Sequence, residues 1–401
     1  MASQQVRGIE RFGLPRRMGI KEVEHIISRL KDSASSDWRI ELSRVRPRFD
    51  SGLTNIMHTV VAEALQHVFE KRDVPEEICQ AAVAAIMDGQ CDEVTIAAFL
   101  TALCVKGEAL SEIVGAARAM SQRAERVPTQ RQGLLDTCGT GGDELKTFNI
   151  STATAFVAAA CGIPVAKHGN RSVSSNSGSA DVLETLGVHT QLTPAQVALC
   201  LDQVGIGFCF APLFHGAMRH AAPVRKALRF RTLFNLLGPL TNPANAEYQL
   251  LGASRTAIAK KLANALARLG RRRAFVVCGN NQLDEVSLWG ETAVFETVGG
   301  DVRRHTWAAA TFGLPECRVE DLKVDSPAES ADRVRAVFAG EHGATRDIIV
   351  ANTAAALIAA EVETDPRAAA QRANQVIESG QASALLERFT QLTLSLGSGA
   401  A

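Results

Sequence analysis

Two consecutive loops of small and polar residues constrain this chain more than any other feature. The first loop, Asp136 to Thr152, reads DTCGTGGDELKTFNIST and follows the apolar pair Leu134-Leu135, which we predict to end a buried strand. The apolar segment Ala153–Ala160 after it predicts a helix that Gly162 ends. Glycines at 139, 141 and 142 leave few Cβ atoms, so backbone N–H groups can approach an anion closely.

Polar side chains gather where the helix after this loop begins. Thr147, Asn149, Ser151 and Thr152 supply three hydroxyls and an amide there. Unpaired N–H groups and the positive end of the helix dipole favour phosphate at such a position. The loop matches neither GxGxxG nor GxxxxGK[ST], which disfavours a Rossmann dinucleotide site and a Walker loop.

A second loop repeats this arrangement. Pro164–Ala166 predicts a short strand, and Lys167–Arg171 (KHGNR) stands at its carboxyl end. A serine-rich stretch, 172–179, leads into a helix that contains Val182 and Leu183 and stops at Gly187. Open α/β sheets bind ligands beyond the carboxyl ends of their strands. Either loop alone fits an ordinary connection, but two in succession indicate a ligand site.

Charge and cysteine usage exclude several classes of function. Lys+Arg and Asp+Glu both number 43, so no charge imbalance points to nucleic acid or to a membrane surface. No apolar stretch is long enough to span a bilayer, and the N-terminus lacks the apolar core of a secretory signal. Nine cysteines, scattered without CxxC spacing, predict reduced thiols in a cytoplasmic protein rather than a metal cluster or disulfide framework.

The hydrophobic pattern divides the chain into three parts. Residues 1–54 are basic at their start and predict a partly ordered extension, with a short amphipathic helix over Lys21–Lys31. Residues 55–127 predict a set of helices packed on one another. Residues 128–401 alternate apolar runs with amphipathic helices. The predicted fold class is α/β: a small α-helical N-terminal domain and a larger α/β domain with a mainly parallel sheet flanked by helices.

Capping residues and breakers predict several local boundaries. Ser111 is a candidate N-cap for a helix from Glu112 to Arg123, and Ser254 for one from Ala257 to Leu269. The stretch His215–Pro243 follows Pro212 and is divided into short pieces by Pro223, Pro239 and Pro243. Asp301–Pro327 is predicted to be irregular.

The two loops carry a family resemblance. GTGGD-xxx-TFNIST and KHGNRSVSS-x-SGSADVLE resemble anthranilate phosphoribosyltransferases of tryptophan biosynthesis, within the nucleoside phosphorylase and phosphoribosyltransferase fold. Ala222–Pro243 and the pair Asp284-Glu285 match the same family, and the resemblance runs from about Asn55 to near the C-terminus. It implies transfer of a phosphoribosyl group from phosphoribosyl pyrophosphate to the amino group of anthranilate, releasing pyrophosphate, with Mg²⁺ as cofactor.

The resemblance also implies which residues hold each ligand. The phosphoribosyl pyrophosphate set is Gly139, Thr140, Gly141, Gly142, Asp143, Thr147, Asn149, Ile150, Ser151, Thr152, Lys167, Arg171, Ser174, Ser175 and Ser179. The anthranilate set is Gly139, His168, Asn170 and Arg225, with Arg231 as a rival to Arg225 for the carboxylate. The Mg²⁺ set is Ser151, Asp284 and Glu285. Asn176 stands where the family frequently has a long polar or basic side chain, which leaves one electrostatic contact open.

The reaction itself needs no acid or base residue. An arylamine is neutral at pH 7, so its nitrogen already carries a free lone pair, and the difficult step is cleavage of the bond from C1 to pyrophosphate. Charge neutralisation and positioning then supply most of the rate. The resemblance further implies a homodimer through the helical domain, to which the return segment 215–245 also belongs.

Two other functions remain open at this point. A pyrimidine nucleoside phosphorylase shares the fold and a similar Lys-His loop, but it uses phosphate and lacks the carboxylate pair. A non-catalytic nucleic-acid-binding relative would be strongly basic. GTGGD, NIST and Asp284-Glu285 argue against the phosphorylase, and zero net charge argues against the binding protein.

Overall fold

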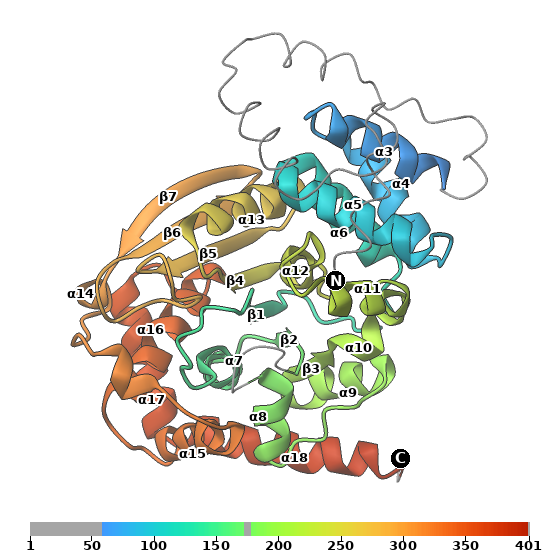
Figure 1. The fold of residues 1–401 in the computed structure, drawn as a ribbon. Coiled ribbons are helices and arrows are strands. Elements are labelled where there is room, and N and C mark those ends of the chain that lie inside the picture. Colours follow the sequence, from blue (N-terminus) through green and yellow to red (C-terminus); the bar gives the residue numbers. More distant parts are fainter. Residues whose placement is uncertain (1–57, 172–177, 400–401) are drawn as a thin grey trace, which may run out of the picture. The chain divides into compact units, whose positions relative to one another are not determined.

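The computed structural model describes residues 58–171 and 178–399, so the predicted helix at Lys21–Lys31 lies outside them (Figure 1). Its centre is a seven-stranded sheet in the order β3-β2-β1-β4-β5-β6-β7. The strands are β1 (Leu135–Gly139), β2 (Val165–Gly169), β3 (Ile206–Phe210), β4 (Tyr248–Gly252), β5 (Arg273–Gly279), β6 (Thr292–Val298) and β7 (Asp301–Trp307).

The sheet is parallel from β3 to β5, and β6 and β7 add an antiparallel extension. The predicted mainly parallel sheet is therefore confirmed. The prediction that 301–327 lacks regular structure was wrong, because β7 and α14 (Ala309–Phe312) lie within it. As an edge strand, β7 pairs with β6 alone and exposes most of its side chains, so it lacks the apolar run that marks a buried strand.

One face of the sheet is covered by helices that come mainly from the C-terminal part of the chain (Figure 1). Phe156 of α7 packs edge-on against Phe338 and Phe389, with ring centroids 6.2 and 5.8 Å apart. These helices are α7 (Ile150–Ala160), α8 (Ser179–Thr185), α9 (Pro194–Val204), α15 (Pro327–Phe338), α16 (Ala344–Ala359), α17 (Pro366–Glu378) and α18 (Gln381–Gly397).

The other face shares a second core with the N-terminal helices and the return segment. Leu251, Val276 and Leu262 of the α/β part belong to the same buried cluster as Leu100 and Leu237. The helices are α3 (Thr59–Phe69), α4 (Glu76–Met87), α5 (Glu93–Lys106), α6 (Leu110–Gln122) and α13 (Thr256–Arg268). The helix α10 (Ala211–Phe214) leads into the return segment. This segment consists of the 3₁₀ turn η3 (Gly216–His220), α11 (Ala222–Leu228), α12 (Phe234–Leu237) and the 3₁₀ turn η4 (Gly238–Leu240), short pieces as predicted.

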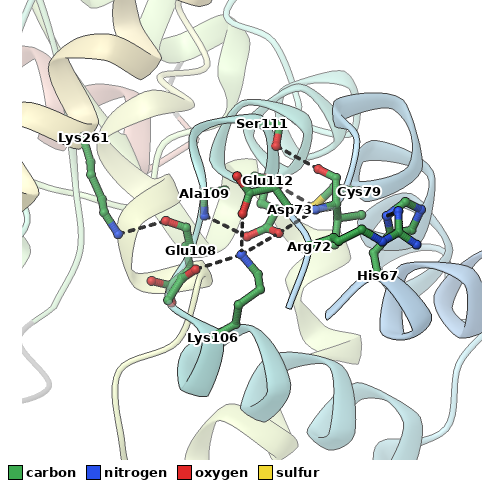
Figure 2. Close-up of polar contacts among 12 residues, drawn as sticks. His67, Arg72, Asp73, Cys79, Lys106, Glu108, Ala109, Ser111, Glu112 and Lys261 are labelled. Atoms are coloured by element: carbon green, nitrogen blue, oxygen red, sulfur yellow. Dashed lines mark hydrogen bonds and ion pairs between the residues drawn. The ribbon is translucent and has the colours of Figure 1, made fainter. Parts of the chain in front are cut away.

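Two predicted helix caps were wrong, and the reason is the same in both places. The helix α6 begins at Leu110, where the buried Glu112 carboxylate accepts hydrogen bonds of 2.8 Å from Ala109 N and from Val74 N. Ser111 instead donates to the Val74 carbonyl (Figure 2). The helix α13 begins at Thr256, whose N–H donates to Asn281 Oδ1 at 2.8 Å, so Ser254 is not its cap. In both places a side chain other than the predicted serine, Glu112 or Asn281, accepts the hydrogen bond from the backbone N–H group.

The helical part is tied to the α/β part by polar contacts of the loop between α5 and α6. Lys106 Nζ lies 3.1 Å from the carboxylates of both Asp73 and Glu112, which fixes this loop (Figure 2). Lys261 of α13 donates to the Glu108 carbonyl at 2.8 Å. None of the helices between 58 and 399 that the structure describes combines the length and apolarity needed to cross a membrane.

Candidate active site

Four parallel strands end in glycine at the same edge of the sheet. The last residues of β1, β2, β4 and β5 are Gly139, Gly169, Gly252 and Gly279, and Gly139 is paired directly with Gly252. The loops that leave these ends contain most of the predicted site residues. The carboxyl edge of a parallel sheet is the usual place for a ligand in such folds.

The glycine loop, Gly139–Asp143, contacts the acidic pair that follows β5. Gly141 N donates to Asp284 Oδ2 at 2.8 Å, and Thr140 N donates to the Gly252 carbonyl at 2.8 Å. A Cβ atom on Gly139 would lie 2.5 Å from Asp284 Oδ2, so this position requires the absence of a side chain. The structure thus brings together two motifs that are far apart in the sequence.

The helix α7 begins earlier than predicted, at Ile150, with Asn149 as its N-cap. The Asn149 side-chain oxygen accepts from Thr152 N at 2.9 Å and from the Ser151 hydroxyl at 3.3 Å. Ser151 and Thr152 therefore lie in the first turn, where backbone N–H groups lack helical partners. Ile150 is buried and its N–H donates to the Phe148 carbonyl, so its side chain serves the core.

Lys167 brings a cation to the start of α7. It lies inside β2, which continues to Gly169 and so extends further than predicted. Its side chain is 3% exposed and donates to the Thr137 carbonyl and, at 3.1 Å, to the Ser151 hydroxyl. Burial lowers the pKa of Lys167, and the negative charges of Asp136, Glu285 and Asp284 act against this shift.

The carboxylates at this edge are poorly compensated. Burial, and then the charge of Asp284, raise the pKa of Glu285. Burial also raises the pKa of Asp284, against which the Gly141 N–H acts. Burial and the Asp284 charge raise the pKa of Asp143 to about 7. Neighbouring negative charges in a partly dehydrated place favour a cation between them.

These donors fit Mg²⁺. Two carboxylates and the Ser151 hydroxyl offer oxygen atoms only, and Mg²⁺ prefers oxygen ligands while keeping waters and substrate oxygens. Within 58–171 and 178–399, no group of three or more His, Cys, Asp or Glu side chains is arranged to hold a metal by itself. A site with few protein ligands suits a metal that arrives with a phosphate ester.

A second region of the site is less acidic and contains neutral imidazoles. The His168 and His215 rings lie 5.1 Å apart, and His168 Nδ1 lies 3.0 Å from the Gly238 carbonyl. Burial lowers the pKa of His168 to about 4 and that of His215 to about 3, so both are uncharged at pH 7. The guanidinium of Arg225, in α11, lies over the Phe234 ring at 5.8 Å, and burial lowers its pKa.

Some predicted ligands lie apart from this edge or outside the described residues. The Arg171 guanidinium binds Glu184 at 2.6 Å and Asp181 at 3.2 Å, so it is engaged with α8 rather than with the glycine loop. Ser179 Oγ donates to the carbonyl of Asn170, an exposed residue, at 3.2 Å. Ser174, Ser175 and Asn176 are outside the described residues. Thr147 lies before α7 and forms an isolated antiparallel bridge with Lys323.

Sequence reasoning missed three contacts at the site. Arg231, considered only for anthranilate, donates through Nη2 to the carbonyls of Gly141 and Gly142 at 3.1 and 3.0 Å. His215, to which the sequence analysis gave no role, lies beside His168. The Ser330 hydroxyl of α15 accepts from Asn149 N at 2.9 Å. No local pattern signals such contacts, since each joins distant parts of the chain.

Two family descriptions match this chain. The glycosyl transferase family a/b domain matches residues 131–383, and the glycosyl transferase family helical bundle domain matches 62–124. The anthranilate phosphoribosyltransferase of Desulforamulus reducens is 46% identical over 337 residues, which cover 84% of this chain and 98% of that protein. That of Methylibium petroleiphilum is 48% identical over 334 residues, 83% of this chain and 97% of that protein.

Solved structures agree with these relatives. The anthranilate phosphoribosyltransferase of Thermus thermophilus superposes with a TM-score of 0.78 at 40% identity, covering 82% of this chain and 99% of that chain. The enzyme of Saccharomyces cerevisiae in complex with PRPP and Mg gives a TM-score of 0.77 at 28% identity, covering 84% and 99%. Sequence, fold and site agree, and the chain belongs to the anthranilate phosphoribosyltransferase family of glycosyl transferases.

Proposed function

We propose that the carboxyl edge of β1, β2, β4 and β5 is where this enzyme joins its two substrates. The enzyme transfers the 5-phosphoribosyl group from phosphoribosyl pyrophosphate (PRPP) to the amino group of anthranilate, giving N-(5-phosphoribosyl)anthranilate and pyrophosphate, and it uses Mg²⁺. The observation that carries the placement is the convergence of Gly141 N on Asp284 and of Lys167 Nζ on Ser151.

The diphosphate and ribose of PRPP would occupy the space between the glycine loop and the start of α7. Backbone N–H groups of a glycine loop and of a first helical turn suit phosphate oxygens. Those of Thr140, Gly141 and Thr152 already donate to protein oxygens in this structure, so Gly142 and Asp143 are the proposed loop donors. Lys167 adds a buried positive charge beside them. The proposed contacts come from Gly139, Thr140, Gly141, Gly142, Asp143, Thr147, Asn149, Ile150, Ser151, Thr152 and Lys167, with Arg171, Ser174, Ser175 and Ser179 toward the 5′-phosphate.

Ser151, Asp284 and Glu285 would hold the Mg²⁺ ion. When bound, Mg²⁺ supplies positive charge to the oxygens of the departing pyrophosphate. The chain's own part is to place two carboxylates beside the glycine loop, so that the loop donors and the metal ligands meet the same group. Lys167 orients the Ser151 hydroxyl through its hydrogen bond.

Anthranilate would be held by Arg225, with Gly139, His168 and Asn170 shaping its place. A guanidinium fork binds a carboxylate through two parallel hydrogen bonds, and the partly buried Arg225 makes no ion pair among the described residues. His168 and His215 are uncharged at pH 7, so they add no positive charge to this region, and the amine of anthranilate is itself neutral at that pH. The protein's contribution is positioning and charge neutralisation rather than acid–base chemistry.

We also propose a homodimer formed through the helical domain. The helix α5 is apolar around its circumference, yet Val94 and Val105 on one side of it are 78% and 84% exposed. A helix of this kind is normally covered. A second copy of the same face is the occupant that the family implies. The corresponding domains are 55–127 with the return segment 215–245, and 128–401, after an extension 1–54.

The proposed location of the enzyme is the cytoplasm. All nine cysteines lie within the described residues and all are free thiols, as expected for a reducing compartment. Fractionation of cells that express the full chain would check this. Recovery of the protein outside the cytoplasmic fraction, with its cysteines in disulfide bonds, would contradict it.

The test of the site is the fluorescence-monitored consumption of anthranilate by pure protein with PRPP and Mg²⁺. The variant Asp284→Asn/Glu285→Gln should lose turnover, while Asp301→Asn, an exposed carboxylate on β7, should retain it. Turnover that survives in the double variant would reject the metal assignment. Absence of turnover in the folded wild-type protein at every Mg²⁺ concentration would reject the reaction.

A further inference from the structure

We propose that Arg231 is a positioning residue for PRPP: it braces the glycine loop so that the loop presents its N–H groups to the diphosphate. The proposal rests on the proposed role of Gly139–Asp143. Arg231 follows α11 in the return segment, and its sequence position alone made it a rival to Arg225 for the anthranilate carboxylate.

The contacts of Arg231 explain how the brace works. Its Nη2 atom donates to the carbonyl oxygens of Gly141 and Gly142, at 3.1 and 3.0 Å. In a trans peptide group the C=O and the following N–H point in opposite directions. Holding these two carbonyls on one side therefore directs the N–H groups of Gly142 and Asp143 to the other side. That is the orientation a diphosphate needs from a loop with few Cβ atoms.

The shape of the loop fits this arginine. Gly142 has a φ of 70°, and a Cβ atom at this position would overlap the Arg231 guanidinium. The glycine is therefore required twice, by its backbone conformation and by the close approach of the arginine. The neighbouring Gly141, with a φ of 66°, has open space where its Cβ would lie.

The brace is anchored in the helical domain. Cys104 Sγ of α5 lies 3.4 Å from the Arg231 carbonyl oxygen, and Thr232 N donates to Asn235 Oδ1 at 3.0 Å. The loop that would bind the diphosphate is thus linked to α5 through one side chain.

These contacts assign different substrates to the two arginines of the return segment. Arg225 lies over the Phe234 ring and makes no ion pair among the described residues, whereas Arg231 is engaged with the glycine loop. Loss of Arg231 should therefore weaken the binding of PRPP and leave the binding of anthranilate unchanged. A residue with a merely structural role would lower the enzyme's stability and affect both substrates alike.

The experiment compares Arg231→Gln, Arg231→Lys and the control Arg229→Gln in steady-state kinetics with each substrate varied. Arg229 is an exposed arginine that ends α11. Because the lost hydrogen bonds have a charged donor, Arg231→Gln should raise KM for PRPP about tenfold and leave KM for anthranilate within about twofold. Arg231→Lys should be intermediate, since an ammonium group lacks the guanidinium fork. Arg229→Gln should match wild type.

Binding of PRPP, measured by titration calorimetry without anthranilate, gives a readout that is independent of turnover. An unchanged PRPP affinity in Arg231→Gln would overturn the brace, as would equal increases in both KM values. Gly142→Ala separates this outcome from failure of the proposed function. If Gly142→Ala weakens the binding of PRPP and Arg231→Gln does not, only the proposed role of Arg231 is wrong. If neither substitution weakens the binding of PRPP, the glycine loop is not the diphosphate site and both proposals are wrong.

Discussion

The ammonium group of Lys167 lies 3.1 Å from the hydroxyl oxygen of Ser151, and this hydrogen bond joins the middle of β2 to the first turn of α7. Ser151 is the proposed hydroxyl ligand of Mg²⁺, so a buried cation and a metal would share one oxygen atom. Such sharing is favourable only when anions surround both cations. The nearby carboxylates and the diphosphate of PRPP would provide them.

Replacement of Lys167 by methionine should keep the length of the side chain and remove its charge and donors. We expect kcat/KM for PRPP to fall about 100-fold, the usual effect of losing one aligned donor at developing charge. Initial rates with PRPP varied would check this, with circular dichroism to confirm that Lys167→Met is folded. A folded variant with wild-type kcat/KM would contradict the role of Lys167.

Replacement of Arg225 by lysine should keep the positive charge and lose the planar fork. We expect kcat/KM for anthranilate to fall roughly 10- to 100-fold, because bidentate binding of a carboxylate is lost, with KM for PRPP unchanged. The measurement is the same assay with anthranilate varied. Benzoate-type ligands offer a further check, since their binding should weaken in parallel. A change confined to the KM for PRPP would show that Arg225 contacts PRPP instead of anthranilate.

Replacement of Glu285 by glutamine should stabilise the protein when Mg²⁺ is absent. The charge of Glu285 is buried and lies beside Asp284, so its removal should raise the unfolding free energy by about 1–2 kcal/mol at pH 8. Thermal unfolding with EDTA would show this, and Glu341→Gln, at an exposed carboxylate, serves as the control. Addition of Mg²⁺ and PRPP should stabilise wild type more than the variant. Equal melting temperatures with EDTA would contradict the prediction.

The two buried histidines should make the protein less stable in acid. An unfolded histidine takes up a proton near pH 6.5, whereas His168 and His215 do so only near pH 4 and 3. Between these limits the unfolded chain gains protons that the folded chain does not, so unfolding becomes easier by about 1.4 kcal/mol per pH unit for each histidine. His215→Phe should reduce this slope by one histidine's share in urea unfolding from pH 6.5 to 4.5. An unchanged slope would show that His215 titrates normally.

The exposed side of α5 should govern assembly. Val94→Glu and Val105→Glu each place a charge on the apolar surface proposed to meet a second copy. Light scattering after size exclusion should then report a dimer for wild type and a monomer for the double variant. Glu108→Gln, in the loop after α5, is a control that leaves this surface unchanged. A wild-type monomer, or a dimer that survives both charges, would contradict the interface.

The residues of the site that are predictable from the sequence belong to continuous motifs. The glycine loop, the start of α7, Lys167 and the Asp284-Glu285 pair are each recognisable within a few residues of sequence. The fold class followed from the alternation of apolar runs and helices. The first residues of α6 and α13 were not predicted correctly. The side chains of Glu112 and Asn281, rather than Ser111 and Ser254, accept hydrogen bonds from the backbone N–H groups there.

Contacts between remote segments could not be predicted. Arg231 and Gly141 are 90 residues apart, and Asn149 and Ser330 are 181 apart. Hydrogen bonds of this kind depend on how the return segment and α15 pack against the sheet, which no local periodicity encodes. The same limit applies to β7, since an edge strand with mostly exposed side chains lacks the apolar run that identifies a strand.

The glycines that end β1, β2, β4 and β5 restrict how this enzyme can be re-engineered. A Cβ on Gly252 would overlap the Asp284 backbone, and one on Gly279 would lie 2.7 Å from the Ser287 Cβ. One on Gly169 would meet the Phe208 ring at 2.7 Å. This rim is built from main chain, so mutational libraries gain nothing by diversifying it. A change of acceptor would have to be sought in the return segment, which contains Arg225, the proposed contact for the aromatic substrate.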